Sequence, residues 1–166
     1  MPLHATRVRA DTATATVASS SKEVTDWTLR YFGPWWNAAP AESTGLADGG
    51  GLLLADVDPV RLQDLQRQIA DLETTEVTYA ATRTLVAESE NGAICALQPD
   101  AHLAYHYTPE TSRLVIVGAD TQPVAVAAAR LTRELVRGQL LRAGFHILHA
   151  SAVVHDGRAL LSFGPK

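Results

Sequence analysis

The chain has 166 residues, of which 46% are hydrophobic and 19% charged, and its formal net charge is −4. This length fits one domain, or one domain and the opening of a second, with enough apolar residues for a buried core. The negative charge disfavours a nucleic-acid binder, which usually carries a basic excess. Cys95 is the single cysteine, which excludes an intrachain disulfide and a cysteine-based zinc site.

The chain shows no sequence signal for export or for membrane insertion. Residues 1–10 lack the continuous apolar stretch of a secretion signal. No window reaches the roughly 20 apolar residues that a transmembrane helix needs. We therefore expect a cytoplasmic protein that binds neither a membrane nor nucleic acid.

The first third of the chain predicts a strand, a helix and a long loop. Residues 12–18 alternate Thr, Ala and Val, as a strand does. Ser20 and Glu23 have the spacing of a capping box, ahead of a helix that Gly33 ends. Residues 37–51 are rich in Ala, Pro, Ser, Asp and Gly and predict a flexible surface loop.

The middle of the chain predicts a second helix and then a run of strands. Residues 52–57 read as a buried strand, and Asp58-Pro59 supplies an N-cap and a first-turn proline for the next helix. The apolar stripe of that helix consists of Leu62, Leu65, Ile69 and Leu72. The strands expected after it are 77–88, 93–97, 102–107 and 113–117, with a hairpin turn at Asn91-Gly92.

A long helix and two short strands are expected next. Pro123 opens the helix, and Gly144 has the character of the residue just past its end. Two short apolar strands then flank Asp156-Gly157.

The last strand runs into Gly164-Pro165-Lys166. A buried strand followed by these residues is how the phosphate-binding pattern G-x-x-x-x-G-K-[ST] begins. An ordinary turn at the end of an unrelated α+β domain also fits them. Gly164 would be the first glycine of the pattern, and Lys166 would not be its phosphate-binding lysine.

Leu148-His149-Ala150, the Asp-Gly turn and the strand into Gly164 together resemble the start of the catalytic domain of the HPr kinase-like P-loop serine kinases. His149 and Gly164 are 15 positions apart, which is the spacing in that family between an active-site histidine and the first P-loop glycine. The resemblance covers residues 148–166, and residues before about 120 match only in general layout.

The resemblance implies an α/β fold in two parts. Residues 1–120 would form a small α+β leading domain, and residues 121–166 a long helix and the first strands of an incomplete P-loop domain. His149 would lie beside the β- and γ-phosphates and assist phosphoryl transfer, while Gly164, Pro165 and Lys166 would begin the phosphate cradle. The complete protein would use ATP and Mg²⁺ to phosphorylate a hydroxyl on a protein, a peptide or a small molecule.

The lysine and the Mg²⁺-binding hydroxyl of the pattern would fall after residue 166. Phosphoryl transfer depends on these groups, so we expect this chain alone to be inactive and to hold no nucleotide. The other interpretation of His149 is a core histidine bonded to a backbone carbonyl. His146 and His149 predict no metal site, because strand residues three apart face opposite ways.

The alternative function is a non-catalytic recognition or regulatory module that binds a peptide or a partner chain. Trp35 and Trp36 either pack internally or form a recognition platform. Arg130, Arg133 and Arg137 share a helical face that is either solvated or meets an acidic partner. A final strand pair without a following helix leaves apolar surface uncovered, so we also expect a homo-oligomer or a complementing chain.

Overall fold

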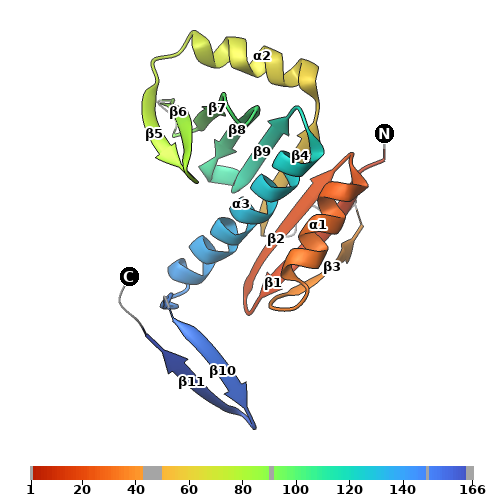
Figure 1. Cartoon of the computed structure of the whole chain (residues 1–166), viewed down its shortest axis with the longest axis vertical. Helices are drawn as coiled ribbons and strands as arrows, with labels where there is room; N and C mark the ends of the chain where they lie inside the picture. The colour runs from red at the N-terminus through yellow and green to blue at the C-terminus, as the bar shows by residue number, and fades with distance from the viewer. Residues whose placement is uncertain (1, 43–49, 90–91, 149, 164–166) are drawn as a thin grey trace.

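The computed structural model describes residues 2–42, 50–89, 92–148 and 150–163 (Figure 1). Within these ranges the chain forms three α-helices, a nine-stranded mixed sheet and a separate two-stranded hairpin. The helices are α1 (Lys22–Phe32), α2 (Pro59–Ala70) and α3 (Thr121–Arg142). The sheet strands are β1 (His4–Ala10), β2 (Ala13–Ser19), β3 (Asn37–Ala41), β4 (Gly51–Val57), β5 (Thr75–Tyr79), β6 (Thr82–Glu88), β7 (Ile94–Gln98), β8 (Leu103–Thr108) and β9 (Arg113–Gly118). The hairpin strands are β10 (Ser151–His155) and β11 (Arg158–Ser162). The mixed α/β class predicted from the sequence is confirmed.

The sheet has a parallel centre and antiparallel flanks. Its strand order is β3-β1-β2-β4-β9-β8-β7-β6-β5. β2, β4 and β9 run parallel, and the other neighbouring pairs are antiparallel. The β2–α1–β3 connection leads to one edge of the sheet, whereas the β4–α2–β5 connection leads to the other. The two connections therefore diverge at the carboxyl ends of β2 and β4.

Helices cover both faces of the central strands. α1 and α3 lie side by side on one face (Figure 1), and α2 packs on the other. Leu114 and Ile116 of β9 pack with residues of α1 and α3, whereas Val115 and Val117 pack with α2. This burial on two sides explains why β9 is a continuous apolar run and not an alternating one.

α3 is the longest of the three helices, and it contacts α1, β2, β4 and β9. Its buried residues lie on several sides of the helix: Val124, Ala125, Ala127, Ala128, Ala129, Thr132 and Val136. The small alanine side chains allow its neighbours to approach closely, because interaxial distance depends on the side chains at the contact. The two-part division predicted from the sequence places this helix with residues 143–166. In the structure, the helix packs on the sheet that residues 4–118 form.

β1 and β3 are strands that the sequence pattern does not predict. β3 lies within the predicted loop 37–51, so this part of the loop prediction is wrong. It pairs antiparallel with β1, from Asn37 opposite Arg9 to Ala41 opposite Ala5. Pro40 is compatible with this pairing because β3 is an edge strand. Residues 43–49 lie outside the described ranges.

The predicted strand 77–88 is two strands, β5 and β6, which form an antiparallel hairpin. Ala80 and Ala81 make the turn between them, with positive φ angles of 55° and 61°. Glycine and asparagine favour this backbone, whereas alanine does not. The turn therefore leaves no signal in the sequence, and the alternating pattern reads as one strand.

The hairpin β10–β11 stands apart from the nine-stranded sheet (Figure 1). Its two predicted strands are present, and Asp156 and Gly157 turn with positive φ angles of 46° and 71°. All residues from Ser151 to Ser162 are exposed. The hairpin therefore contributes nothing to the core of the sheet.

Candidate functional site

The turn after α1 separates the tandem tryptophans. The Trp36 ring stacks on Phe32, with ring centroids 5.0 Å apart and an interplanar angle of 7°. Trp36 also packs against buried Val8 and Ala129. Trp35, in contrast, is 83% exposed. The structure thus assigns Trp36 to internal packing and leaves Trp35 on the surface.

Backbone hydrogen bonds hold this turn in place. The Gly33 amide donates to the carbonyl of Leu29 at 2.9 Å. The amides of Trp35 and Trp36 both donate to the carbonyl of Phe32, at 3.1 and 2.8 Å. A Cβ at position 33 would lie 2.9 Å from the Leu29 oxygen, so glycine is the residue that fits there. The exposed Trp35 is therefore mounted on a fixed turn.

Two adjoining grooves run from this turn across α1 to α3. One has a volume of about 500 Å³ and the other about 240 Å³, and both are lined by Tyr31 and Arg133. Trp35, Trp36 and Arg30 line the larger one, whereas Arg130 lines the smaller one. Several lining residues have an aromatic or a guanidinium side chain, and together we call them the aromatic–arginine surface. They are Trp27, Arg30, Tyr31, Phe32, Trp35, Trp36, Arg130 and Arg133.

The cations of this surface are incompletely neutralised. Glu134 pairs with Arg133 at 3.1 Å and with Arg137 at 3.4 Å. The Arg30 guanidinium lies 5.9 Å from the centroid of the Trp27 ring, a cation–π distance. Within the part of the chain that the structure describes, Arg30 and Arg130 form no ion pair. The surface therefore carries a net positive charge on a chain that is negative as a whole.

Arg130 also lies near two tyrosines of the sheet. Burial raises the pKa of the Tyr79 phenol, and the Arg130 guanidinium partly offsets this rise. Burial likewise raises the pKa of Tyr105, again with Arg130 acting in the opposite direction. Arg130 therefore acts electrostatically on two tyrosines of the antiparallel flank, Tyr79 on β5 and Tyr105 on β8.

A buried polar network fixes the position of that flank. The Tyr105 hydroxyl donates to Oε1 of Gln98 at 2.7 Å. Nε2 of Gln98 donates to Oγ1 of Thr84 at 3.0 Å and to the carbonyl of Tyr79 at 3.2 Å. The network joins β8, β7, β6 and β5, and so fixes the Tyr79 end of the β5–β6 hairpin on the sheet.

Sequence reasoning placed Trp35, Trp36, Arg130, Arg133 and Arg137 on a candidate partner surface. The structure brings the first four to the grooves, whereas Arg137 pairs with Glu134 and lies outside the residues that line them. Arg30 of the surface was missed, although it lies three residues after Trp27 along the helix. The helical spacing of Trp27 and Tyr31 favours internal packing for both, yet Tyr31 is 47% exposed and lines both grooves.

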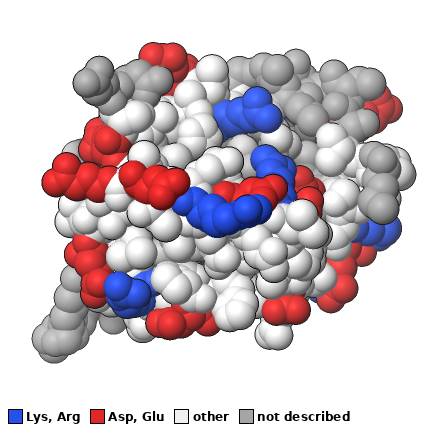
Figure 2. Space-filling model, turned by 90° about the horizontal axis from the view of Figure 1, so that it is seen from above, with Lys and Arg blue, Asp and Glu red and all other residues white. Residues whose placement is uncertain are grey.

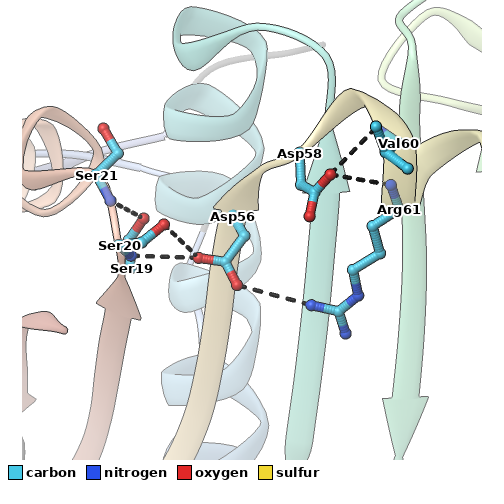
Figure 3. A network of polar contacts seen from close by, with 7 residues as sticks. All are labelled: Ser19, Ser20, Ser21, Asp56, Asp58, Val60 and Arg61. Atoms are coloured by element: carbon cyan, nitrogen blue, oxygen red, sulfur yellow. Dashed lines mark hydrogen bonds and ion pairs between the residues drawn. The ribbon is translucent and has the colours of Figure 1, made fainter. Parts of the chain in front are cut away.

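A second polar cluster lies where the β2 and β4 connections diverge (Figure 3). The backbone amide and the hydroxyl of Ser20 donate to Oδ1 of Asp56, at 3.2 and 3.1 Å. Oδ2 of Asp56 lies 3.7 Å from Arg61. Asp58 accepts from the amides of Val60 and Arg61 at 3.1 and 2.9 Å, which confirms it as the N-cap of α2.

This cluster corrects the predicted capping box. α1 begins at Lys22 with Ser21 as its N-cap, and no side chain caps its first turn. Ser20 is bound to Asp56, a residue 36 positions away, in place of the helix amides. Ligands of open α/β sheets often bind at such divergence points. Here the carboxylate of Asp56 already accepts two hydrogen bonds from Ser20, so we assign the cluster a structural role.

The residues predicted to bind nucleotide, His149, Gly164, Pro165 and Lys166, lie outside the described ranges. The described pair nearest to them is Ser151 opposite Ser162, at the open end of the hairpin.

A further cavity of about 440 Å³ lies between α2 and strands β7 to β9. Cys95 and His106 line it and face each other across the β7–β8 pair. Burial raises the pKa of the Cys95 thiol, which disfavours the nucleophilic thiolate. Among the described residues, no group of three His, Cys, Asp or Glu side chains is arranged to hold a metal ion.

No protein-family model, curated protein or solved structure matches the chain. Across the described ranges, no helix combines the length and the apolar character that crossing a membrane requires.

Proposed function

We propose that the chain is the amino-terminal part of an HPr kinase-like enzyme, which transfers the γ-phosphoryl group of ATP to a hydroxyl on a protein, a peptide or a small molecule. The observation that carries this proposal is the hairpin β10–β11. Its strands pair in register, with Ser151 opposite Ser162. The chain segments that lead to His149 and to Gly164 therefore leave the hairpin at the same end, as a shared phosphate site requires.

The composition of the hairpin supports the same proposal. Residues on one face are all apolar: Ala152, Val154, Ala159 and Leu161. The opposite face carries Ser151, Ser162, His155 and Arg158 together with Val153 and Leu160. An isolated two-stranded hairpin is marginal in water and needs a covering layer. In the proposed kinase, the rest of the P-loop domain covers the apolar face.

In the complete enzyme, ATP supplies the phosphoryl group and Mg²⁺ neutralises its developing charge. The role of this chain is positional. His149 would lie beside the transferring group and assist it, and the backbone amides from Gly164 to Lys166 would begin the loop that holds the phosphates. Without the lysine and hydroxyl of the pattern, residues 1–166 alone should neither hold Mg-ATP nor transfer a phosphoryl group.

The reading frame after codon 166 tests the proposal directly. The pattern requires a second glycine five positions after Gly164, followed by lysine and by serine or threonine. A stop codon, or other residues at those positions, would overturn the kinase proposal.

Ligand-induced stabilisation gives a second test. A protein that includes the loop should gain about 2.7 kcal/mol at a Mg-ATP concentration 100 times Kd, whereas residues 1–166 should show no thermal shift. In the longer protein, His149→Ala should slow phosphoryl transfer by about 100-fold or more and leave Mg-ATP binding intact. His155→Ala, on the exposed hairpin, is the matched control and should leave both unchanged.

The second candidate function is a recognition module without catalysis. The exposed Trp35 beside Arg30 and Arg133 favours it, because exposed tryptophan and arginine are typical of binding hot spots.

A further inference from the structure

We propose that the aromatic–arginine surface binds an acidic, extended segment of a partner protein. The proposal concerns α1, its following turn and α3, and involves neither the hairpin nor a nucleotide. It stands independently of the kinase proposal.

The shape of the surface suits an extended chain. The two grooves adjoin at Tyr31 and Arg133, with the exposed Trp35 lining one and Arg130 lining the other. Indole and phenol faces accept apolar or proline side chains with little loss of conformational entropy. Guanidinium groups bind carboxylates through paired hydrogen bonds. A segment that alternates carboxylates with an apolar side chain would engage both kinds of group.

The charge of the surface selects an acidic occupant. Arg30 and Arg130 have no carboxylate partner within the described residues, and Arg133 shares Glu134 with Arg137. The α2 end of the molecule differs, because acidic and basic side chains are intermingled there (Figure 2). Arg67 at that end is paired with Asp64. Both arginines of α2 thus have an ion-pair partner, whereas Arg30 and Arg130 of the α1–α3 face have none among the described residues.

The binding platform is preorganised. Phe32 is 3% exposed, Trp36 stacks on it, and the turn that carries Trp35 is fixed by the Phe32 carbonyl. Little of the free energy of binding is then lost in ordering the surface. A single-stranded nucleic acid would need a longer positive track than this surface provides.

Selection from a random 12-residue peptide phage library tests the proposal. The bait is the intact chain, with counter-selection against the Trp35→Ala, Arg133→Glu double variant. We expect enriched peptides that contain several Asp or Glu residues and at least one apolar or proline residue. Absence of enrichment, or enrichment of basic or uncharged peptides, would overturn the proposal.

Fluorescence anisotropy of the most enriched peptide then measures each residue. We expect a Kd on the order of 10 µM. Trp35→Ala and Arg133→Glu should each weaken binding by about tenfold or more. Arg67→Glu is the matched charge reversal on α2 and should change Kd by less than about twofold. Replacing the acidic residues of the peptide by Asn and Gln should abolish binding.

Two further measurements decide against other occupants. Single-stranded dT15 should bind at least ten times more weakly than the peptide; tighter binding would assign the surface to nucleic acid and reject the proposal. Sedimentation velocity should give the same association state for the parent chain and the Trp35→Ala variant. Dissociation caused by that substitution would mean that a second copy of the chain is the occupant. Circular dichroism confirms that each variant is folded.

Discussion

Thr132 is fully buried on α3, and its hydroxyl has no hydrogen-bond partner among the described residues. Burying a hydroxyl without a partner costs about 1–3 kcal/mol. Valine replaces the hydroxyl by a methyl group of similar size, and its helix propensity is close to that of threonine. We therefore expect Thr132→Val to raise the free energy of unfolding by about 1–2 kcal/mol.

Thr28 on α1 is the matched control. It is equally buried, but its hydroxyl donates to the carbonyl of Val24 at 3.2 Å. Thr28→Val loses a bond whose net worth is about 0.5–1.5 kcal/mol and gains an apolar group, so its stability should be unchanged or lower. The two substitutions are chemically identical, and they differ in whether the hydroxyl is bonded.

Urea unfolding followed by circular dichroism at 222 nm measures both variants. The slope of free energy against urea should be unchanged, so the difference appears in the midpoint. In thermal unfolding, Thr132→Val should raise Tm by about 2–8 °C for a chain of this size. If Thr132→Val is no more stable than Thr28→Val, the hydroxyl of Thr132 has a partner, and the reasoning fails.

Three other predictions follow from the described contacts. Asp58→Ala removes the N-cap of α2 and should lower the free energy of unfolding by about 1 kcal/mol, measured by urea titration. Val154→Lys places a charge on the apolar face of the hairpin, and should reduce any concentration-dependent self-association seen by light scattering. The raised pKa of Tyr105 means that the folded state keeps a proton that the unfolded state loses near pH 10. The contribution of the Tyr105 phenol to the free energy of unfolding is therefore complete below pH 10 and declines as pH rises further. Tyr105→Phe should make the fall in stability between pH 10 and 11.5 shallower, by up to about 1.4 kcal/mol per pH unit.

Each of these predictions has an internal control. Asp64→Ala changes an exposed carboxylate of α2 that does not cap the helix, and should alter stability by less than about 0.5 kcal/mol. Ser162→Lys adds the same charge to the other face of the hairpin and should leave self-association as in the parent chain. Measured at pH 7, where the phenol keeps its proton in both states, Tyr105→Phe supplies the baseline for the alkaline slope. Equal effects of variant and control would contradict the corresponding assignment.

The elements that could be read from the sequence are those whose signals are local. Asp58 and Pro59 are adjacent to the helix that they start, and Asp58 does accept its first amides. Gly33 is the C-cap of α1, where an added Cβ would lie 2.9 Å from the Leu29 carbonyl oxygen. Asp156-Gly157 supplies the positive φ angles of the last hairpin. In each case the physical cause lies within four residues of its effect.

The other features of the fold depend on contacts between residues that are far apart in the sequence. β3 becomes a strand only because β1 offers it an edge, and Ser20 leaves its expected capping role because Asp56 reaches it from β4. Trp35 and Trp36 are adjacent in the sequence, yet stacking on Phe32 partly buries Trp36, whereas Trp35 stays exposed. The same packing gathers Arg30, from α1, with Arg133, from α3. The tertiary structure determines which residues far apart in the sequence bond or pack together, and no short stretch of residues encodes these contacts.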